Sequence, residues 1–80
     1  MGKTILSKEI PEDEVLDILE SYPDAEADFV LAMMDVINEH LGESDNDVEF
    51  YKGRATMAVG MFGLHPSTVD ACAEVLTKYS

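Results

Sequence analysis

Residues 24–42 read DAEADFVLAMMDVINEHLG, and their pattern predicts the class of fold. The apolar side chains recur three and four positions apart, which is the spacing of an amphipathic α-helix. Asp24 is a residue type that caps helices at the N-terminus, and Gly42 is a type that ends them. We therefore expect one helix from Asp24 to Leu41, about 27 Å long.

Two further segments have the same periodicity. Between Pro11 and Pro23 the apolar residues again follow the helical spacing, and Pro11 suits the first position of a helix. The last helix is expected to begin at Ser67, with Asp70 completing a capping box. Its buried face is predicted to contain Val69, Cys72, Ala73, Leu76 and Tyr79. These patterns predict a mainly α protein.

The segment 48–64 is compatible with two structures. Lys52-Gly53 can form the turn of a β-hairpin, although it is not one of the preferred turn pairs. The alternative is a helix over residues 54–62 that buries four side chains: Met57, Ala58, Met61 and Phe62. We favour the helix, because these residues pair at a spacing of four.

The chain as a whole is expected to form a single domain over residues 1–80. The predicted fold is a compact bundle of three to four helices, with Lys3–Leu6 as a candidate edge strand. The α+β alternative adds the Lys52-Gly53 hairpin to this bundle.

One half of the chain is strongly acidic. The net charge is −12 on 80 residues, and the segment from Glu9 to Glu49 holds fifteen Asp and Glu residues without one Lys or Arg. A surface that serves only solubility mixes both signs, and self-repulsion of this kind destabilises a compact state. We therefore expect the acidity to serve the binding of a basic partner.

The composition also predicts a compartment. The single cysteine, Cys72, cannot form an intrachain disulfide, which favours a reducing environment. No secretory signal is visible, and no apolar run approaches the roughly 20 residues that cross a bilayer. We expect a cytoplasmic protein, located in the host cell cytoplasm if a phage encodes it.

The acids are predicted to form two ridges opposite the apolar helix faces. We define the first ridge as Asp13, Asp17 and Glu20, and the second ridge as Asp24, Asp28, Asp35 and Glu39. The negative surface is expected to continue through Asp45, Asp47 and Glu49. Leu31 lies near the second ridge and is a candidate hydrophobic anchor for a partner. These residues together are the predicted partner-binding site.

Two such ridges would suit a cleft built for the dense negative charge of a nucleic-acid backbone. In size, charge and carboxylate ridges, residues 9–49 resemble the small acidic phage-encoded inhibitors of nucleic-acid machinery, the anti-CRISPR and DNA-mimic proteins. Those proteins share no common motif, so the resemblance transfers no residue roles. It implies an inhibitor whose partner is a basic protein, such as a nuclease or another nucleic-acid-binding complex, with no direct binding of nucleic acid or membrane.

A second, partial resemblance is to the four-helix immunity proteins of nuclease colicins. It rests on Glu39-His40, on residues 44–51 and on Pro66-Ser67. The pair Phe50-Tyr51 replaces the usual Tyr-Tyr, and the spacing from Tyr51 to Pro66 is too long. This resemblance implies the same kind of partner, a basic nuclease.

Two other functions remain open. The chain is a structural or adaptor subunit if its acidity serves only solubility. A helix-turn-helix regulator is the third reading, because Phe62–Val69 resembles the turn of that motif. The helix that follows offers Asp70 and Glu74 where DNA binding needs cations or amides.

Metal and catalytic motifs are incomplete. The pattern Asp45-x-Asp47-x-Glu49 has the spacing of a calcium loop, but Phe50 stands where that loop needs glycine. The two histidines and the cysteine match no zinc spacing. Nothing isolates a carboxylate in an apolar pocket, as acid–base catalysis requires. We expect no metal, no cofactor and no enzymatic activity, and Cys72 is predicted to be an inert buried thiol.

Overall fold

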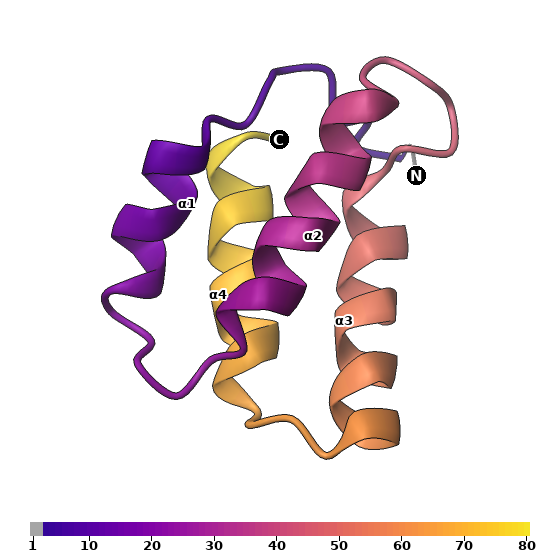
Figure 1. Cartoon of the computed structure of the whole chain (residues 1–80). Helices are drawn as coiled ribbons and strands as arrows, with labels where there is room; N and C mark the ends of the chain where they lie inside the picture. The colour runs from indigo at the N-terminus through magenta and orange to yellow at the C-terminus, as the bar shows by residue number, and fades with distance from the viewer. Residues whose placement is uncertain (1–2) are drawn as a thin grey trace.

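The computed structural model describes residues 3–80, which form four α-helices around one hydrophobic core (Figure 1). The helices are α1 (Glu12–Leu19), α2 (Ala27–Glu39), α3 (Val48–Phe62) and α4 (Ser67–Lys78). Residues 3–80 contain no β-strand, so the prediction of a mainly α bundle is confirmed. None of these helices combines the length and the apolar character that a membrane crossing needs.

The central helix is α4. The other three helices all pack on it, and α1 and α3 flank it on opposite sides (Figure 1). Its fully buried side chains include Ala71, Cys72, Val75 and Leu76, which recur at helical spacing. Cys72 and Leu76 were predicted to be buried, but the predicted Ala73 is only half-buried. The predicted capping box is wrong, because α4 has no side-chain cap hydrogen bond.

The helix α3 begins at Val48 and is continuous, so the hairpin alternative is wrong. It starts six residues earlier than predicted because the side chain of Asp47 accepts a hydrogen bond from the Phe50 N–H at 2.9 Å and caps the helix. Gly63, with φ of 66°, ends the helix in the left-handed conformation that favours glycine.

The segment before α1 runs in an extended conformation and supplies part of the core. Leu6 and Ile10 are both buried. Ile5 forms one isolated antiparallel bridge with Asp47, so the predicted edge strand is reduced to a single bridge. The Asn38 side chain donates to the Ile10 carbonyl at 2.9 Å and accepts from the Ile10 N–H at 2.8 Å. These two bonds hold the segment along α2.

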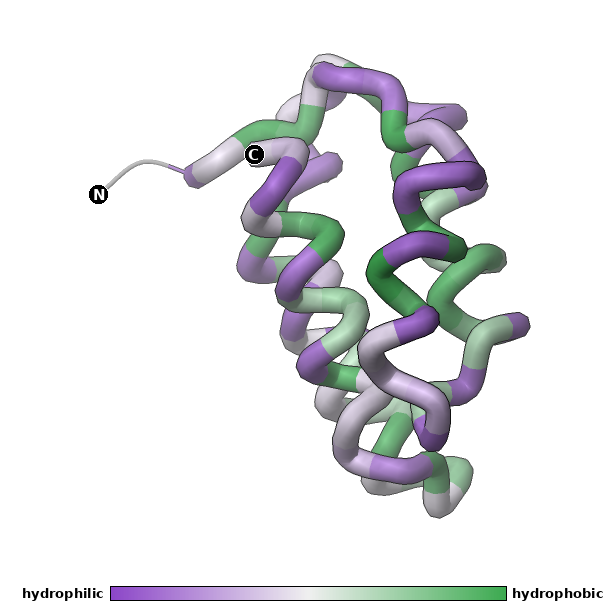
Figure 2. The backbone as a smooth tube through the Cα atoms, turned by 90° about the vertical axis from the view of Figure 1, so that its left-hand side faces the viewer, coloured by the Kyte–Doolittle hydropathy of each residue, from purple (hydrophilic) through white to green (hydrophobic). Residues whose placement is uncertain are grey.

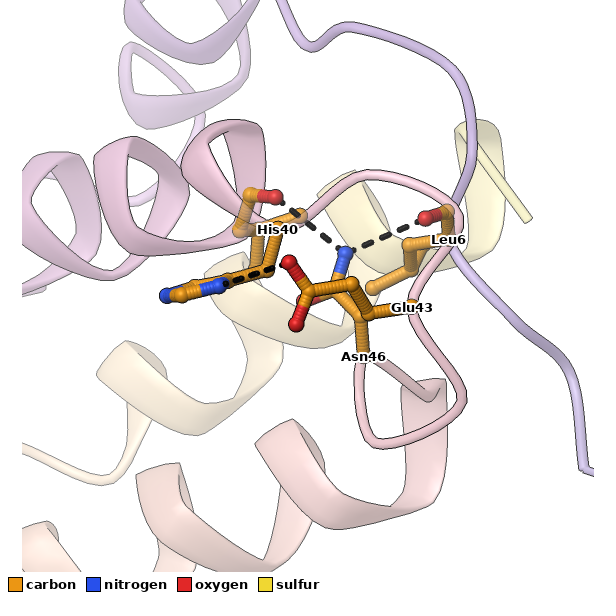
Figure 3. A network of polar contacts seen from close by, with 5 residues as sticks. Leu6, His40, Glu43 and Asn46 are labelled. Carbon is orange, nitrogen blue, oxygen red and sulfur yellow. Dashed lines mark hydrogen bonds and ion pairs between the residues drawn. The ribbon is translucent and has the colours of Figure 1, made fainter.

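Asn46 ties the same segment to the end of α2 (Figure 3). Its buried Nδ2 donates to the carbonyls of Leu6, at 3.1 Å, and Ile37, at 3.2 Å. Beside it, His40 Nδ1 lies 3.2 Å from the Glu43 carboxylate. One buried amide therefore links the N-terminal segment, α2 and the start of α3.

The helices α1 and α2 are both shorter than predicted. α2 starts at Ala27 because the Glu26 N–H donates to Thr68 Oγ1 on α4 at 3.0 Å, which anchors the turn before the helix. Asp24 lies in this turn and does not cap α2. Hydrophilic and hydrophobic residues alternate along the backbone at the spacing of amphipathic helices (Figure 2). The predicted periodicity is therefore present, but over 13 residues of α2 instead of 18.

Candidate partner-binding surface

Three exposed acids belong to each ridge in the structure. The first ridge keeps all of its acids, and the second ridge loses Asp24. We call Asp13, Asp17 and Glu20 the α1 acids, although Glu20 is the cap residue just after that helix. We call Asp28, Asp35 and Glu39 the α2 acids. All six are exposed, and α1 and α2 contact each other. Within residues 3–80 none of the six forms an ion pair.

Asp24 is separated from the second ridge. It lies in the turn before α2, exposed, with its carboxylate 3.8 Å from His65 Nε2. The remaining α2 acids span a helix of about 20 Å, which is shorter than the predicted 27 Å. Asp24 and Asp28 therefore do not share a helix, whereas Asp13 with Asp17 and Asp35 with Glu39 stand four residues apart on a helix.

The three acids beyond α2 have different environments. Asp45 is exposed in the connection to α3, and Glu49 is exposed in the first turn of α3. Asp47 is buried and its carboxylate caps α3, so the prediction that it belongs to the exposed negative surface is wrong. The acid needed at a helix N-terminus and the acid offered to a partner look alike in the sequence.

Leu31 is not a free anchor. It is half-buried and packs against the hydrophobic core, beside Ile10 and Pro11 of the N-terminal segment. The segment covers this side of α2 because Asn38 holds it there. The role of Leu31 as a partner anchor stays a prediction, since only part of its side chain is accessible.

Two polar contacts join α4 to the α1 region. Lys78 forms an ion pair with Glu14, and this contact holds the pKa of the Glu14 carboxyl below its usual value and raises the pKa of Lys78. The Tyr22 hydroxyl donates to Glu74 at 2.7 Å, and the hydrogen bond raises the pKa of Tyr22. Both contacts are at the surface, where an ion pair contributes little to stability.

The sequence prediction missed an open apolar groove between α2 and α3. Its volume is about 330 Å³. The α2 wall consists of Phe29, Ala32, Met33 and Val36. The α3 wall consists of Tyr51, Arg54, Met57, Ala58, Met61 and Phe62. We call this feature the α2/α3 groove.

The α3 wall of the groove contradicts the predicted core. Met57, Met61 and Phe62 were expected to be buried, but they are 63%, 69% and 70% exposed. Ala58 alone of the four is buried. The early start of α3 explains the difference, because the helix packs through an alternative face that begins at Val48 and continues through Tyr51 and Ala55.

The signal for this arrangement was present in the sequence. When α3 begins at Val48, Val48, Tyr51, Ala55 and Ala58 form one complete buried stripe. Phe50, Met57 and Met61 then form a second apolar stripe at i, i+7 and i+11, which the first stripe leaves without a partner. A helix begun at Arg54 hides the distinction between the two stripes.

The possible metal-ligating side chains of residues 3–80 are dispersed, and the Cys72 thiol is buried. Among residues 3–80, no three His, Cys, Asp or Glu side chains come together as a metal site would require. Burial raises the pKa of the Cys72 thiol to about 12, which removes its thiolate at neutral pH. The prediction that Cys72 is buried is confirmed.

Comparisons of the chain with models of protein families, with characterised proteins and with solved structures found no match.

Proposed function

We propose that this chain is a non-catalytic inhibitor that binds a basic, nucleic-acid-binding protein through its acidic surface. The observation that carries the proposal is the set of six exposed α1 and α2 acids, none of which has an ion-pair partner within residues 3–80. The partner's cations would supply the missing counter-charges.

The cost of these acids supports a binding role. Asp13 with Asp17, and Asp35 with Glu39, are like-charge pairs four apart, and each destabilises its helix by about 0.2–0.5 kcal/mol. A single Lys at one of these positions would relieve the repulsion and leave the protein soluble. The acids gain value only against a positive surface, where they accelerate association and fix the orientation of the complex.

A nucleic-acid-binding partner is the best fit to this charge. A cleft that holds a nucleic-acid backbone is lined with cations at close spacing, and its ligand binds by releasing counterions. Carboxylates on two contacting helices offer a similar array of negative charges. This is the mode of action implied by the resemblance to DNA-mimic inhibitors, and it places the protein in the same compartment as its target.

The test is capture followed by competition. Immobilised chain is exposed to a lysate that contains nucleases, and the bound protein is eluted with a salt gradient. We expect a basic protein that salt releases and that the chain displaces from its own DNA or RNA in a purified assay. A captured protein whose nucleic-acid binding is unaffected by the chain would contradict the proposal.

A structural or adaptor subunit is the second candidate, and the exposed apolar side chains of α3 favour it. Met57, Met61 and Phe62 are large apolar residues at the surface, as in subunits that bury such a patch in an assembly. A partner that resists salt and leaves only with denaturant would support this candidate over the inhibitor.

A helix-turn-helix regulator is disfavoured by the packing of α4. A recognition helix must present its first turn to DNA. Here α4 is the central helix, and Thr68 in its first turn is fully buried and accepts the Glu26 N–H. The chain also has a net charge of −12, which DNA repels.

A further inference from the structure

The α2/α3 groove, with a volume of about 330 Å³, can receive the apolar side chains of one face of a helix. Its walls are α2 and α3, of 13 and 15 residues, which are each about 20 Å long. The two helices make little direct contact with each other, since both pack mainly on other helices. A helix of about four turns would lie between them, in the way that amphipathic helices fill apolar grooves.

The α3 wall is apolar and adaptable. Met57 and Met61 are exposed, and methionine side chains adjust to the shape of an apolar partner because they are unbranched and flexible. Phe62 lies at the end of the same wall and is the most exposed of the large apolar residues. Burying such side chains against a partner is favourable at about 25 cal/mol per Å² of apolar surface.

The α2 wall carries the negative charge at its edge. On an α-helix, residues three and four positions apart are neighbours. Asp28 is therefore a neighbour of Ala32, and Glu39 is a neighbour of Val36, and both Ala32 and Val36 line the groove. Asp28 and Glu39 thus flank one side of the groove, whereas Asp35 lies beside Leu31 and the N-terminal segment.

The cation in the groove lining is on the opposite wall. Arg54 lies over the ring of Phe50, 5.6 Å from its centre, in a cation–π contact. The two edges of the groove therefore differ in charge, with the carboxylates of Asp28 and Glu39 on α2 and one guanidinium on α3. A helix that enters the groove would be oriented by this difference.

Charge complementarity indicates which kind of molecule would bind the α2/α3 groove. A second copy of this chain also has a net charge of −12 and would be repelled, as would a nucleic acid. A helix with an apolar face and cations along one edge satisfies both the apolar walls and the α2 acids. We propose that the α2/α3 groove binds one cationic amphipathic helix of the partner, with its Lys or Arg side chains over Asp28 and Glu39. This inference rests on the proposed function in one respect, that the partner is basic.

The test uses a designed peptide and methionine methyl NMR of the full chain. The peptide is a helix of Leu and Lys, with Leu at the spacing of one face, and it is compared with a permuted peptide of the same composition and with a Leu–Glu version. We expect the Leu–Lys helix to shift the methyl signals of Met57 and Met61. The buried Met34 signal is the internal control and should move little.

Matched variants separate the groove from the rest of the surface. Met57→Gln and Met61→Gln alter exposed side chains, so the fold should persist, and together they should weaken peptide binding at least about tenfold. Leu16→Gln is the control, because Leu16 is an exposed apolar residue of α1 outside the groove. Asp28→Asn should weaken binding more than Asp70→Asn, which changes an exposed acid of α4.

Three results would overturn the inference, and they differ in what they say of the proposed function. No binding of the Leu–Lys helix would remove the groove as a site, whatever the lysate capture yields. Equal binding of the permuted peptide would show attraction by charge alone, which leaves a basic partner possible. Equal binding of the Leu–Glu helix would show that the acids beside the groove contribute nothing to its binding, which overturns the inference, while the lysate capture still decides the proposed function.

Discussion

At the residue scale, a few polar side chains hold in place the segments that lie outside the helices. Asn46, Asn38 and Thr68 each accept from or donate to the backbone of a segment distant in the sequence. A buried backbone group without a partner is costly, so such side chains fix where the chain can run. Their partners are far away in sequence, and no local pattern could have predicted these bonds.

Replacement of Asn46 tests this role. Asn46→Ala removes two buried hydrogen bonds, although the carbonyls of Leu6 and Ile37 keep the N–H groups of Gly42 and His40, and it should lower the free energy of unfolding by about 2 kcal/mol. Ser44→Ala is the control, since Ser44 is exposed in the same connection. Urea unfolding of both variants measures the difference. Equal stabilities would show that Asn46 does not hold the segment.

The thiol of Cys72 gives a second prediction at this scale. Burial raises its pKa to about 12, so the folded protein should resist alkylation by iodoacetamide at pH 8. The unfolded protein in guanidinium should react readily, because its thiol has an ordinary pKa. Mass spectrometry counts the modified molecules. Fast alkylation of the native protein would mean that α4 is not the covered central helix.

At the element scale, the sequence predicted which segments are helical better than where they begin. The helices α1, α2 and α4 were recognised from their apolar periodicity, which packing on one core requires. Asp24 and Ser67 were chosen as caps because they have the right residue type. The side-chain cap in the structure is Asp47, on a different helix, α3. The N-terminal segment fixes residues 46–48 there from outside the helix. Tertiary contacts of that kind leave no local trace.

The candidate surface was predicted in the same uneven way. The α1 and α2 acids could be assigned from helical wheels, because amphipathic helices expose their charged face. The α2/α3 groove could not, because its apolar side chains resemble core residues until the start of α3 is known. The partial burial of Leu31 could not be predicted either, because the segment beside it is held there by Asn38.

The cap of α3 makes a prediction for that element. Asp47→Ala removes the side chain that accepts the Phe50 N–H and should destabilise the protein by about 1 kcal/mol. Asp45→Ala removes an equal charge from the exposed connection and should have little effect. Thermal unfolding at one ionic strength compares the two. Equal effects would mean that charge, and not capping, determines the outcome.

The contact between α1 and α4 predicts a pH dependence. Lys78 lowers the pKa of Glu14 below its ordinary value of 4.5, so this contribution to stability is present above pH 4.5 and is lost as the pH falls through the lowered pKa. The difference in stability between the wild type and Glu14→Gln should therefore shrink in acid. Glu12→Gln is the control, since Glu12 lies in the same turn without an ion pair in the described chain. A difference that stays constant from neutral pH to about pH 3 would contradict the assignment.

At the scale of the whole molecule, charge and apolar surface lie together. Two of the α2 acids, Asp28 and Glu39, border the α2/α3 groove, and the central helix α4 is covered by the other three. The core is formed by one side of each helix, and the open side of α3 faces α2 with its methionines exposed. We therefore propose, as the central claim, that the α2 acids are a specific binding surface and not only a source of net charge.

The association rate with the captured partner tests that claim most directly. Asp35→Lys and Asp70→Lys change the net charge equally, at exposed positions on α2 and α4. Close charges across an interface control association and its salt dependence, so we predict that Asp35→Lys slows binding at least about tenfold and weakens its dependence on salt. Asp70→Lys should bind almost as fast as the wild type. Equal losses from the two variants would contradict the account, because only net charge would then matter.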